Sequence, residues 1–194
     1  MGRRRGRLKL IIMSRSEKMP ESYKLNNHDI RLIKQDITDF EVEAFVFYAR
    51  QNLELGAGFG SAITRRGGLA VKKELDAIGS IGLTEAIITS GGSMKAKYIV
   101  HAAGPAFQEE EIDSKLHATI KNALKCAEEK GIRQIALPPM GAGFYGIPLD
   151  ACARLMLNTF KEYFNNESKL NEVIICANDG KEYRAFQNVF KALS

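Results

Sequence analysis

The chain has 194 residues, of which 45% are hydrophobic and 26% are charged, with a formal net charge of +5. This length fits one domain with its own core, since single domains commonly run to ~100–200 residues. No run approaches the ~18 apolar residues of a membrane span, and the apolar stretch at 8–13, interrupted by Lys9, is too short for the ~7–15-residue core of a secretion signal.

The positive charge belongs to one segment. Residues 1–25 hold eight Lys/Arg and two Glu, whereas residues 26–194 hold twenty Lys/Arg and twenty-one Asp/Glu. We therefore predict a basic, flexible N-terminal tail at 1–27 and a single domain at 28–194. A basic tail attracts nucleic acid weakly through phosphate charge, but a solubilising arm is the favoured interpretation.

Three isolated cysteines, Cys126, Cys152 and Cys176, complete the compositional picture. They form no C-x-x-C pair and have no histidine pair nearby, which argues against a zinc site and a disulfide framework. We expect a cytoplasmic protein without a metal or another cofactor.

In chain order, hydrophobic periodicity predicts alternating strands and helices. The predicted elements are a strand at 30–35, a buried strand at 43–49, a helix at 62–78, strands at 85–93 and 97–104, a helix at 113–130, a strand at 133–138, a helix at 149–164, a strand at 171–177 and a helix at 181–193. Such alternation predicts an α/β fold, a three-layer α/β/α sandwich.

Two glycine-rich loops lie between a predicted buried strand and a helix. The first contains Gly56, Gly58 and Gly60, and the second, at 140–146, contains Gly141, Gly143 and Gly146. Glycine lets the backbone approach a ligand closely, and amides at the start of a helix bind anions. Two such loops in one domain indicate a diphosphate held between them. The spacing matches neither a P-loop nor a dinucleotide-binding G-x-G-x-x-G motif.

Asp36 is the third candidate site residue, because it follows the first predicted strand. A carboxylate there can accept a hydrogen bond from the exocyclic amine of a base. It can equally form a turn or helix cap with Thr38 and Asp39. The residues alone leave both interpretations open.

Four fragments in this order resemble the macro domain family. They are QDIT at 35–38, LGAGFGSAI at 55–63, TSGG and KYIVHAAGP within 89–105, and ALPPMGAGFYGIP at 136–148. The resemblance runs from about Ile30 to the C terminus. It implies a mixed central sheet within the sandwich, and ADP-ribose or an ADP-ribosylated macromolecule as the partner.

The resemblance also implies roles for the matching positions. Asp36 and the backbone of Ile37 would bind adenine, Arg50 would lie near the distal ribose, and Asn178 would lie near the base. Backbone amides would hold the pyrophosphate, and Phe144 and Tyr145 would also border the distal ribose. The expected pyrophosphate loops consist of Gly56, Ala57, Gly58, Phe59, Gly60 and Ser61, and of Gly141, Ala142, Gly143, Phe144 and Tyr145.

Departures from the family pattern bear on activity. Phe47 and Arg50 replace two asparagines, Gly60 stands where hydrolytic relatives often have Asp, and Asn178 stands where many have an aromatic ring. Arginine cannot act as a base because it stays protonated, so we name no catalytic residue. The expectation is a binding module with weak or no hydrolysis. The alternatives are an ADP-ribosyl hydrolase or O-acetyl-ADP-ribose deacetylase, and a macro fold adapted to another ligand such as RNA.

The remaining candidates are histidines and a basic helix face. We expect His101, in the middle of a strand, to be structural and His117 to be solvated. Arg65 and Arg66, with Lys72 and Lys73, form a basic stripe on the first helix. A solvated face is the favoured interpretation of this stripe, and contact with nucleic acid is the alternative.

Overall fold

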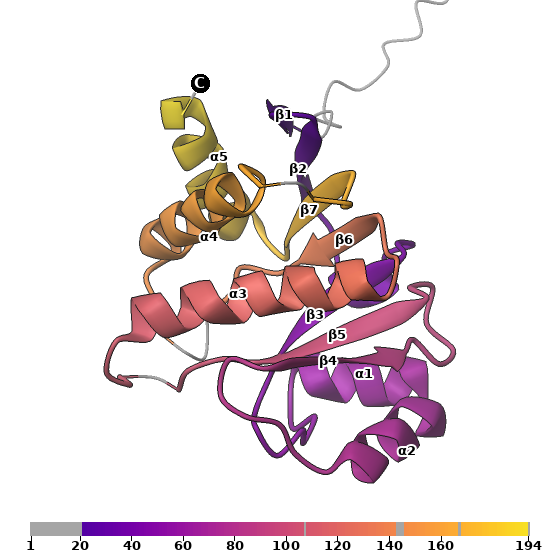
Figure 1. The fold of residues 1–194 in the computed structure, drawn as a ribbon. Helices are drawn as coiled ribbons and strands as arrows, with labels where there is room; N and C mark the ends of the chain where they lie inside the picture. Colours follow the sequence, from indigo (N-terminus) through magenta and orange to yellow (C-terminus); the bar gives the residue numbers. More distant parts are fainter. Residues whose placement is uncertain (1–20, 107, 143–145, 167, 194) are drawn as a thin grey trace, which may run out of the picture.

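The computed structural model describes residues 21–106, 108–142, 146–166 and 168–193. In these residues, five α-helices and a 3-10 helix surround one sheet (Figure 1). The elements are β1 (Glu21–Leu25), β2 (His28–Lys34), η1 (Ile37–Asp39), β3 (Ala44–Ala49), α1 (Phe59–Gly67), α2 (Leu69–Ile78), β4 (Ala86–Ser90), β5 (Tyr98–Ala103), α3 (Ile112–Glu129), β6 (Gln134–Leu137), α4 (Leu149–Tyr163), β7 (Glu172–Ala177) and α5 (Gly180–Leu193).

The sheet is mixed and has seven strands in the order β1-β2-β7-β6-β3-β5-β4. The strands from β2 to β5 in this order pair in parallel, whereas β1 and β4 pair antiparallel at the two edges. Helices cover both faces, so the parallel strands are buried on both sides and consist of continuous apolar runs. The predicted three-layer sandwich with a mixed sheet is therefore confirmed.

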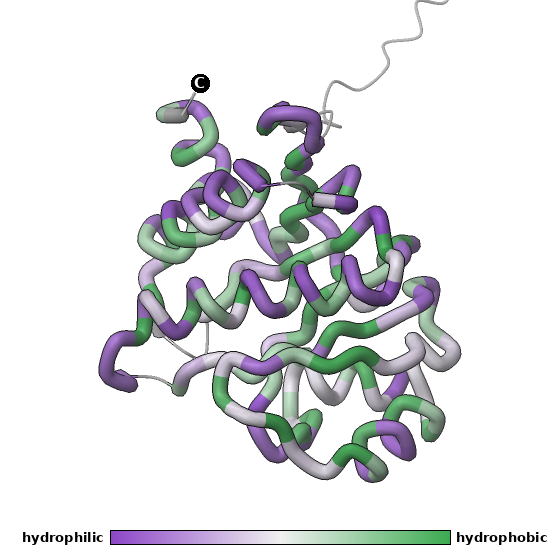
Figure 2. The backbone as a smooth tube through the Cα atoms, viewed as in Figure 1, coloured by the Kyte–Doolittle hydropathy of each residue, from purple (hydrophilic) through white to green (hydrophobic). Residues whose placement is uncertain are grey.

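The apolar residues of strand β3 contribute side chains to two hydrophobic cores, one on each face of the sheet. Val46 and Tyr48 belong to the core shared with α3, α4 and α5, whereas Phe45 and Phe47 belong to the core shared with α1 and α2. Successive side chains of a strand point to opposite faces of the sheet. In Figure 2 the strands at the centre are mainly hydrophobic, while the helices alternate in polarity along their length.

Strand β1 lies in the segment that the sequence analysis assigned to the tail. It pairs along its whole length with β2, and the ring of Tyr23 stacks on Phe190 of α5 with 4.1 Å between ring centroids. The tail boundary at 27 is therefore wrong, because residues 21–25 are part of the sheet. The predicted flexibility and nucleic-acid contact now concern residues 1–20, which lie outside the described residues.

The helix predicted at 62–78 is two helices. It starts earlier, at Phe59, and breaks at Gly68, whose φ of 72° cannot continue a right-handed helix. Elsewhere the predicted elements agree with the structure apart from their ends. Within the described residues, no helix is both long enough and apolar enough to cross a membrane.

Candidate functional site

The carboxyl ends of the central parallel strands meet at one edge of the sheet. A cavity of about 760 Å³ opens there. Lys34 of β2 lies opposite Ala177 of β7, and the amide of Gln35 donates to the carbonyl oxygen of Ala177 at 3.0 Å. Asp36 and Asn178 therefore leave the sheet at the same level. With ~4.8 Å between neighbouring strands, the edge from β2 to β3 measures roughly 14 Å.

Most of the predicted binding residues line this cavity. They are Asp36, Ile37, Arg50, Gly56, Ala57, Gly58, Phe59, Gly60, Gly141, Ala142 and Asn178. Ser61 is exposed on α1 beside the cavity and is not among the lining residues. Gly143, Phe144 and Tyr145 lie outside the described residues.

The first glycine loop leads from β3 to the start of α1. Gly56 and Gly58 both have φ of +62°, and nothing lies within 4 Å of the position a Cβ would take. Gly58 is the N-cap of α1 and provides no side-chain hydrogen bond, and the first amides of a helix have no acceptor within the helix. The loop therefore presents open backbone amides at the positive end of a helix, an arrangement that suits an anion.

Gly60 closes this loop against the backbone. A Cβ on Gly60 would lie 1.4 Å from the carbonyl oxygen of Leu55. No side chain fits there unless the loop moves, so the aspartate of hydrolytic relatives could not take this place in the present loop.

The second glycine loop follows β6 through Pro138 and Pro139, which line the cavity. Gly141 has φ of +79°, and a Cβ there would lie 2.6 Å from Cδ1 of Ile147. The amide of Ile147 donates to the carbonyl oxygen of Gly141 at 3.1 Å. Gly141 and Ala142 thus border the cavity opposite the first loop.

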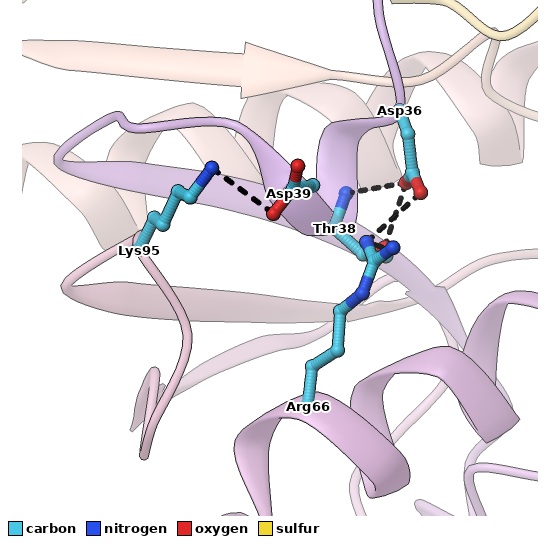
Figure 3. A network of polar contacts seen from close by, with 5 residues as sticks. All are labelled: Asp36, Thr38, Asp39, Arg66 and Lys95. Atoms are coloured by element: carbon cyan, nitrogen blue, oxygen red, sulfur yellow. Dashed lines mark hydrogen bonds and ion pairs between the residues drawn. The ribbon is translucent and has the colours of Figure 1, made fainter.

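Asp36 combines the two roles that its sequence context left open. Its Oδ1 accepts hydrogen bonds from the amide of Thr38 at 2.9 Å and from the Thr38 hydroxyl at 2.7 Å, and its Oδ2 accepts one from Arg66 at 2.8 Å (Figure 3). It therefore caps η1 and also lines the cavity, with 49% of its side chain exposed. A carboxylate has about four acceptor sites, so one remains for a ligand.

The charge of Asp36 follows from the same contacts. Partial burial by itself would raise the carboxyl pKa, but the hydrogen bonds from Thr38 and the Arg66 guanidinium outweigh it, so the pKa lies below its ordinary value. Asp36 is thus an ionised acceptor at neutral pH.

Part of the predicted basic stripe is ion-paired. Besides its pair with Asp36, Arg66 donates to the Thr38 hydroxyl, and Lys72 pairs with Asp76 at 2.7 Å. The prediction of a solvated face was therefore wrong for Arg66, because its partner lies thirty positions away in the chain. Arg65 and Lys73 are exposed as predicted.

Of the two departures from the family's asparagines, Phe47 on β3 and Arg50 directly after it, only Phe47 is buried. Phe47 is buried and contacts Phe59 edge-to-face, with 5.1 Å between ring centroids. Phe47 therefore packs against the first residue of α1, next to the first glycine loop. Arg50 is exposed and lines the cavity where β3 ends, so its guanidinium is available to an anionic ligand.

Sequence reasoning did not assign five polar lining residues of the cavity to the site: Gln35, Thr38, Tyr48, Glu54 and Glu182. The hydroxyl of Tyr48 donates to the carbonyl oxygen of Pro105 at 2.8 Å. Glu182, in the first turn of α5, accepts from the amide of Asn178 at 2.6 Å, and burial raises its carboxyl pKa. The pattern Asp179-x-x-Glu182 is a helix-capping signature that could have indicated Glu182.

The predicted structural role of His101 is confirmed. The side chain is fully buried, with Nε2 2.9 Å from the hydroxyl of Thr89, and burial lowers its pKa to about 4. His117 was expected to be solvated, but it is half-buried between Thr159 and Glu162 on α4. Neither histidine lines the cavity.

The fold is that of a three-layer α/β protein with a cavity at the carboxyl edge of its parallel strands, the place where open α/β sheets bind ligands. The Macro domain family model matches residues 48–156. An uncharacterized protein of Sulfurisphaera tokodaii is 38% identical over 84% of this chain and 91% of its own length. A macro domain-containing protein of Caldanaerobacter subterraneus is 34% identical over 84% and 97%. The chain belongs to the macro domain family.

Solved macrodomain structures agree with this assignment. The Oceanobacillus iheyensis macrodomain with ADP superimposes with a TM-score of 0.84 at 23% identity, covering 90% of this chain and 96% of that one. The Trypanosoma brucei macrodomain in complex with ADP-ribose gives 0.77 at 23% identity, covering 83% and 68%. At this identity the likeness is one of fold.

Proposed function

We propose that this chain binds ADP-ribose, free or attached to a macromolecule, in the cavity at the carboxyl edge of the sheet. One observation carries the proposal: two glycine loops and an ionised aspartate, from three different strand ends, border one cavity. Macrodomains of similar fold have been solved with ADP and with ADP-ribose.

The strand order supplies an orientation for the ligand. Asp36 and Ile37 follow β2, the second loop follows β6, and the first loop and Arg50 follow β3, while β7 lies between β2 and β6. In the proposed complex the adenine lies at Asp36, the diphosphate lies between the loops, and the distal ribose lies near Arg50.

The proposed activity is binding with weak or no hydrolysis. Hydrolysis requires a group that positions or deprotonates a water molecule. Among the described lining residues the carboxylates are Asp36, Glu54 and Glu182; Asp36 is held by Thr38 and Arg66, and Glu182 is held by Asn178 beside the proposed base position. Glu54 is exposed on the first loop, and Arg50 and Gly60 supply no base.

Calorimetric titration of the protein with ADP-ribose, with AMP for comparison, tests the binding. We expect micromolar affinity for ADP-ribose and a loss of at least about tenfold in Asp36→Ala, since a charged hydrogen bond contributes roughly 1.5–3 kcal/mol. Asp39→Ala is the matched control, because Asp39 pairs with Lys95 on the other side of η1 (Figure 3) and does not line the cavity. Absence of heat at millimolar ADP-ribose with folded protein would overturn the proposal.

The same protein tests the hydrolytic alternative. Incubation with O-acetyl-ADP-ribose and with an ADP-ribosylated protein should give no saturable release of product. Saturable turnover that ADP-ribose inhibits would replace the binding module by an enzyme acting at the same cavity.

A further inference from the structure

Glu182 brings a second carboxylate to the end of the cavity where Asp36 lies. It is half-buried in the first turn of α5 and lines the cavity together with Asn178, the first residue after β7. The sequence-based assignment of the site gives it no role.

The strand order places Glu182 opposite one part of the proposed ligand. Strand β7 lies between β2, which leads to Asp36, and β6, which leads to Gly141 and Ala142. If the base lies at Asp36 and the diphosphate at the glycine loops, the ribose that joins them covalently crosses the end of β7. That is where Asn178 and Glu182 line the cavity.

The carboxylate has acceptor capacity to spare. Its Oε2 accepts the amide of Asn178 at 2.6 Å, and a carboxylate offers about four acceptor sites. Carboxylates bind the ribose 2′-hydroxyl in other nucleotide-binding folds, where accommodation of a 2′-phosphate requires an arginine instead. A phosphate at this position would meet a like charge in partly buried surroundings, where repulsion is less screened than in water.

Arg66 is a cation at this end of the cavity, but it is ion-paired with Asp36 at 2.8 Å and is not among the lining residues. Among the described lining residues the basic side chain is Arg50, which follows β3, two strand spacings or ~10 Å along the edge from β7. Lys181 and Arg184 are exposed on α5 and do not line the cavity, and Asp179 in front of them accepts the amides of Lys181 and Glu182.

We propose that Glu182 accepts hydrogen bonds from the hydroxyls of the ribose next to adenine and so makes the site selective for ADP-ribose over its 2′-phosphorylated form. This inference rests on the proposed function and adds a specificity-determining residue to it. The site then excludes 2′-phospho-ADP-ribose, although this ligand has the same base, diphosphate and distal ribose as ADP-ribose.

A purely structural role for Glu182 makes a different prediction. If Glu182 only holds the amide of Asn178 at the start of α5, its replacement would change the affinities for all ligands of the cavity alike. Glu182→Gln keeps the size and an acceptor oxygen for that amide while removing the charge. The ratio of two affinities therefore separates the two roles.

The experiment titrates the wild-type protein, Glu182→Gln and Glu129→Gln with ADP-ribose and with 2′-phospho-ADP-ribose. Glu129 is an exposed carboxylate on α3 outside the cavity, so its variant has the same net charge as Glu182→Gln. We expect wild-type protein and Glu129→Gln to prefer ADP-ribose by at least about tenfold and Glu182→Gln to lose most of this preference, because one charge repulsion is removed.

The outcomes of this experiment test the role of Glu182 and the proposed function separately. Equal wild-type affinity for both ligands would overturn the role of Glu182 whether or not the variant folds, while leaving ADP-ribose binding intact. An unchanged preference in Glu182→Gln would also overturn it, even if both affinities fell. Failure of the wild-type protein to bind ADP-ribose would instead overturn the proposed function itself.

Discussion

Arg66 links the residue proposed to bind the base to the helix that starts at the first glycine loop. Its guanidinium reaches from α1 to Oδ2 of Asp36 and to the hydroxyl of Thr38 (Figure 3). Because Oδ1 of Asp36 is held by Thr38, the carboxylate is fixed from two sides. A fixed acceptor loses less entropy on binding than a mobile one.

At the scale of this residue we predict the effect of Arg66→Ala. Affinity for ADP-ribose should fall by about three- to tenfold as Asp36 loses its fixed orientation, whereas the free energy of unfolding should fall by less than about 1 kcal/mol, because the pair is partly exposed. Calorimetry and urea denaturation measure the two quantities. Arg65→Ala, at the exposed neighbouring position, is the control, and equal affinity in both variants would contradict a positioning role.

At the scale of elements, β1 closes one edge of the fold. It pairs with β2, and Tyr23 covers Phe190 of α5. The strand therefore joins the edge of the sheet to the last helix, on the side of β2 away from β7. An exposed β2 would present an unpaired parallel strand to solvent.

Two truncations test the contribution of β1. Removal of residues 1–20 should leave stability unchanged, because the sequence predicts a basic tail there. Removal of residues 1–27 should lower the free energy of unfolding by roughly 2 kcal/mol, from a half-buried tyrosine and its ring contact. Thermal and urea denaturation of both forms provide the comparison, and equal stability would show that β1 is dispensable.

At the scale of the whole molecule, His101 lies in the middle of β5, between β3 and the edge strand β4, and is fully buried. Its neighbours are Thr89 on β4 and the edge of the Phe47 ring, 5.9 Å away between centroids. Burial disfavours the imidazolium and lowers the pKa from 6.5 to about 4. The unfolded chain therefore binds a proton between these two values where the folded protein does not.

This difference in proton uptake predicts acid sensitivity of the entire fold. Since the unfolded state takes up the proton first, the free energy of unfolding should fall as pH drops below 6.5, by roughly 2 kcal/mol between pH 7 and pH 5. Asp36 and Glu128, whose carboxyl pKa values are lowered by hydrogen bonds that outweigh burial, lose their contributions at lower pH. Urea denaturation at several pH values should show the slope, and His101→Gln should flatten it; an identical slope in the variant would refute the assignment.

Local patterns determined much of this protein from sequence alone. The apolar run of β3 and the helical spacing of α3 and α4 depend on neighbours within one element. The conformations of Gly56 and Gly141 are local too, and the lack of a Cβ is visible in the sequence. The order of strands and helices, the two glycine loops and the position of Asp36 could therefore be predicted, and the cavity brings most of the predicted residues together.

Only the tertiary structure decided which distant residues meet. The addition of β1 to the sheet depended on pairing with β2 and on the contact of Tyr23 with Phe190 of α5. The pairing of Arg66 with Asp36 joins residues thirty positions apart, and the approach of Glu182 to the same cavity follows from the position of β7 between β2 and β6. Strand order is a global property, because it is set by how the helices cover both faces of the sheet, and no local periodicity in the sequence records it.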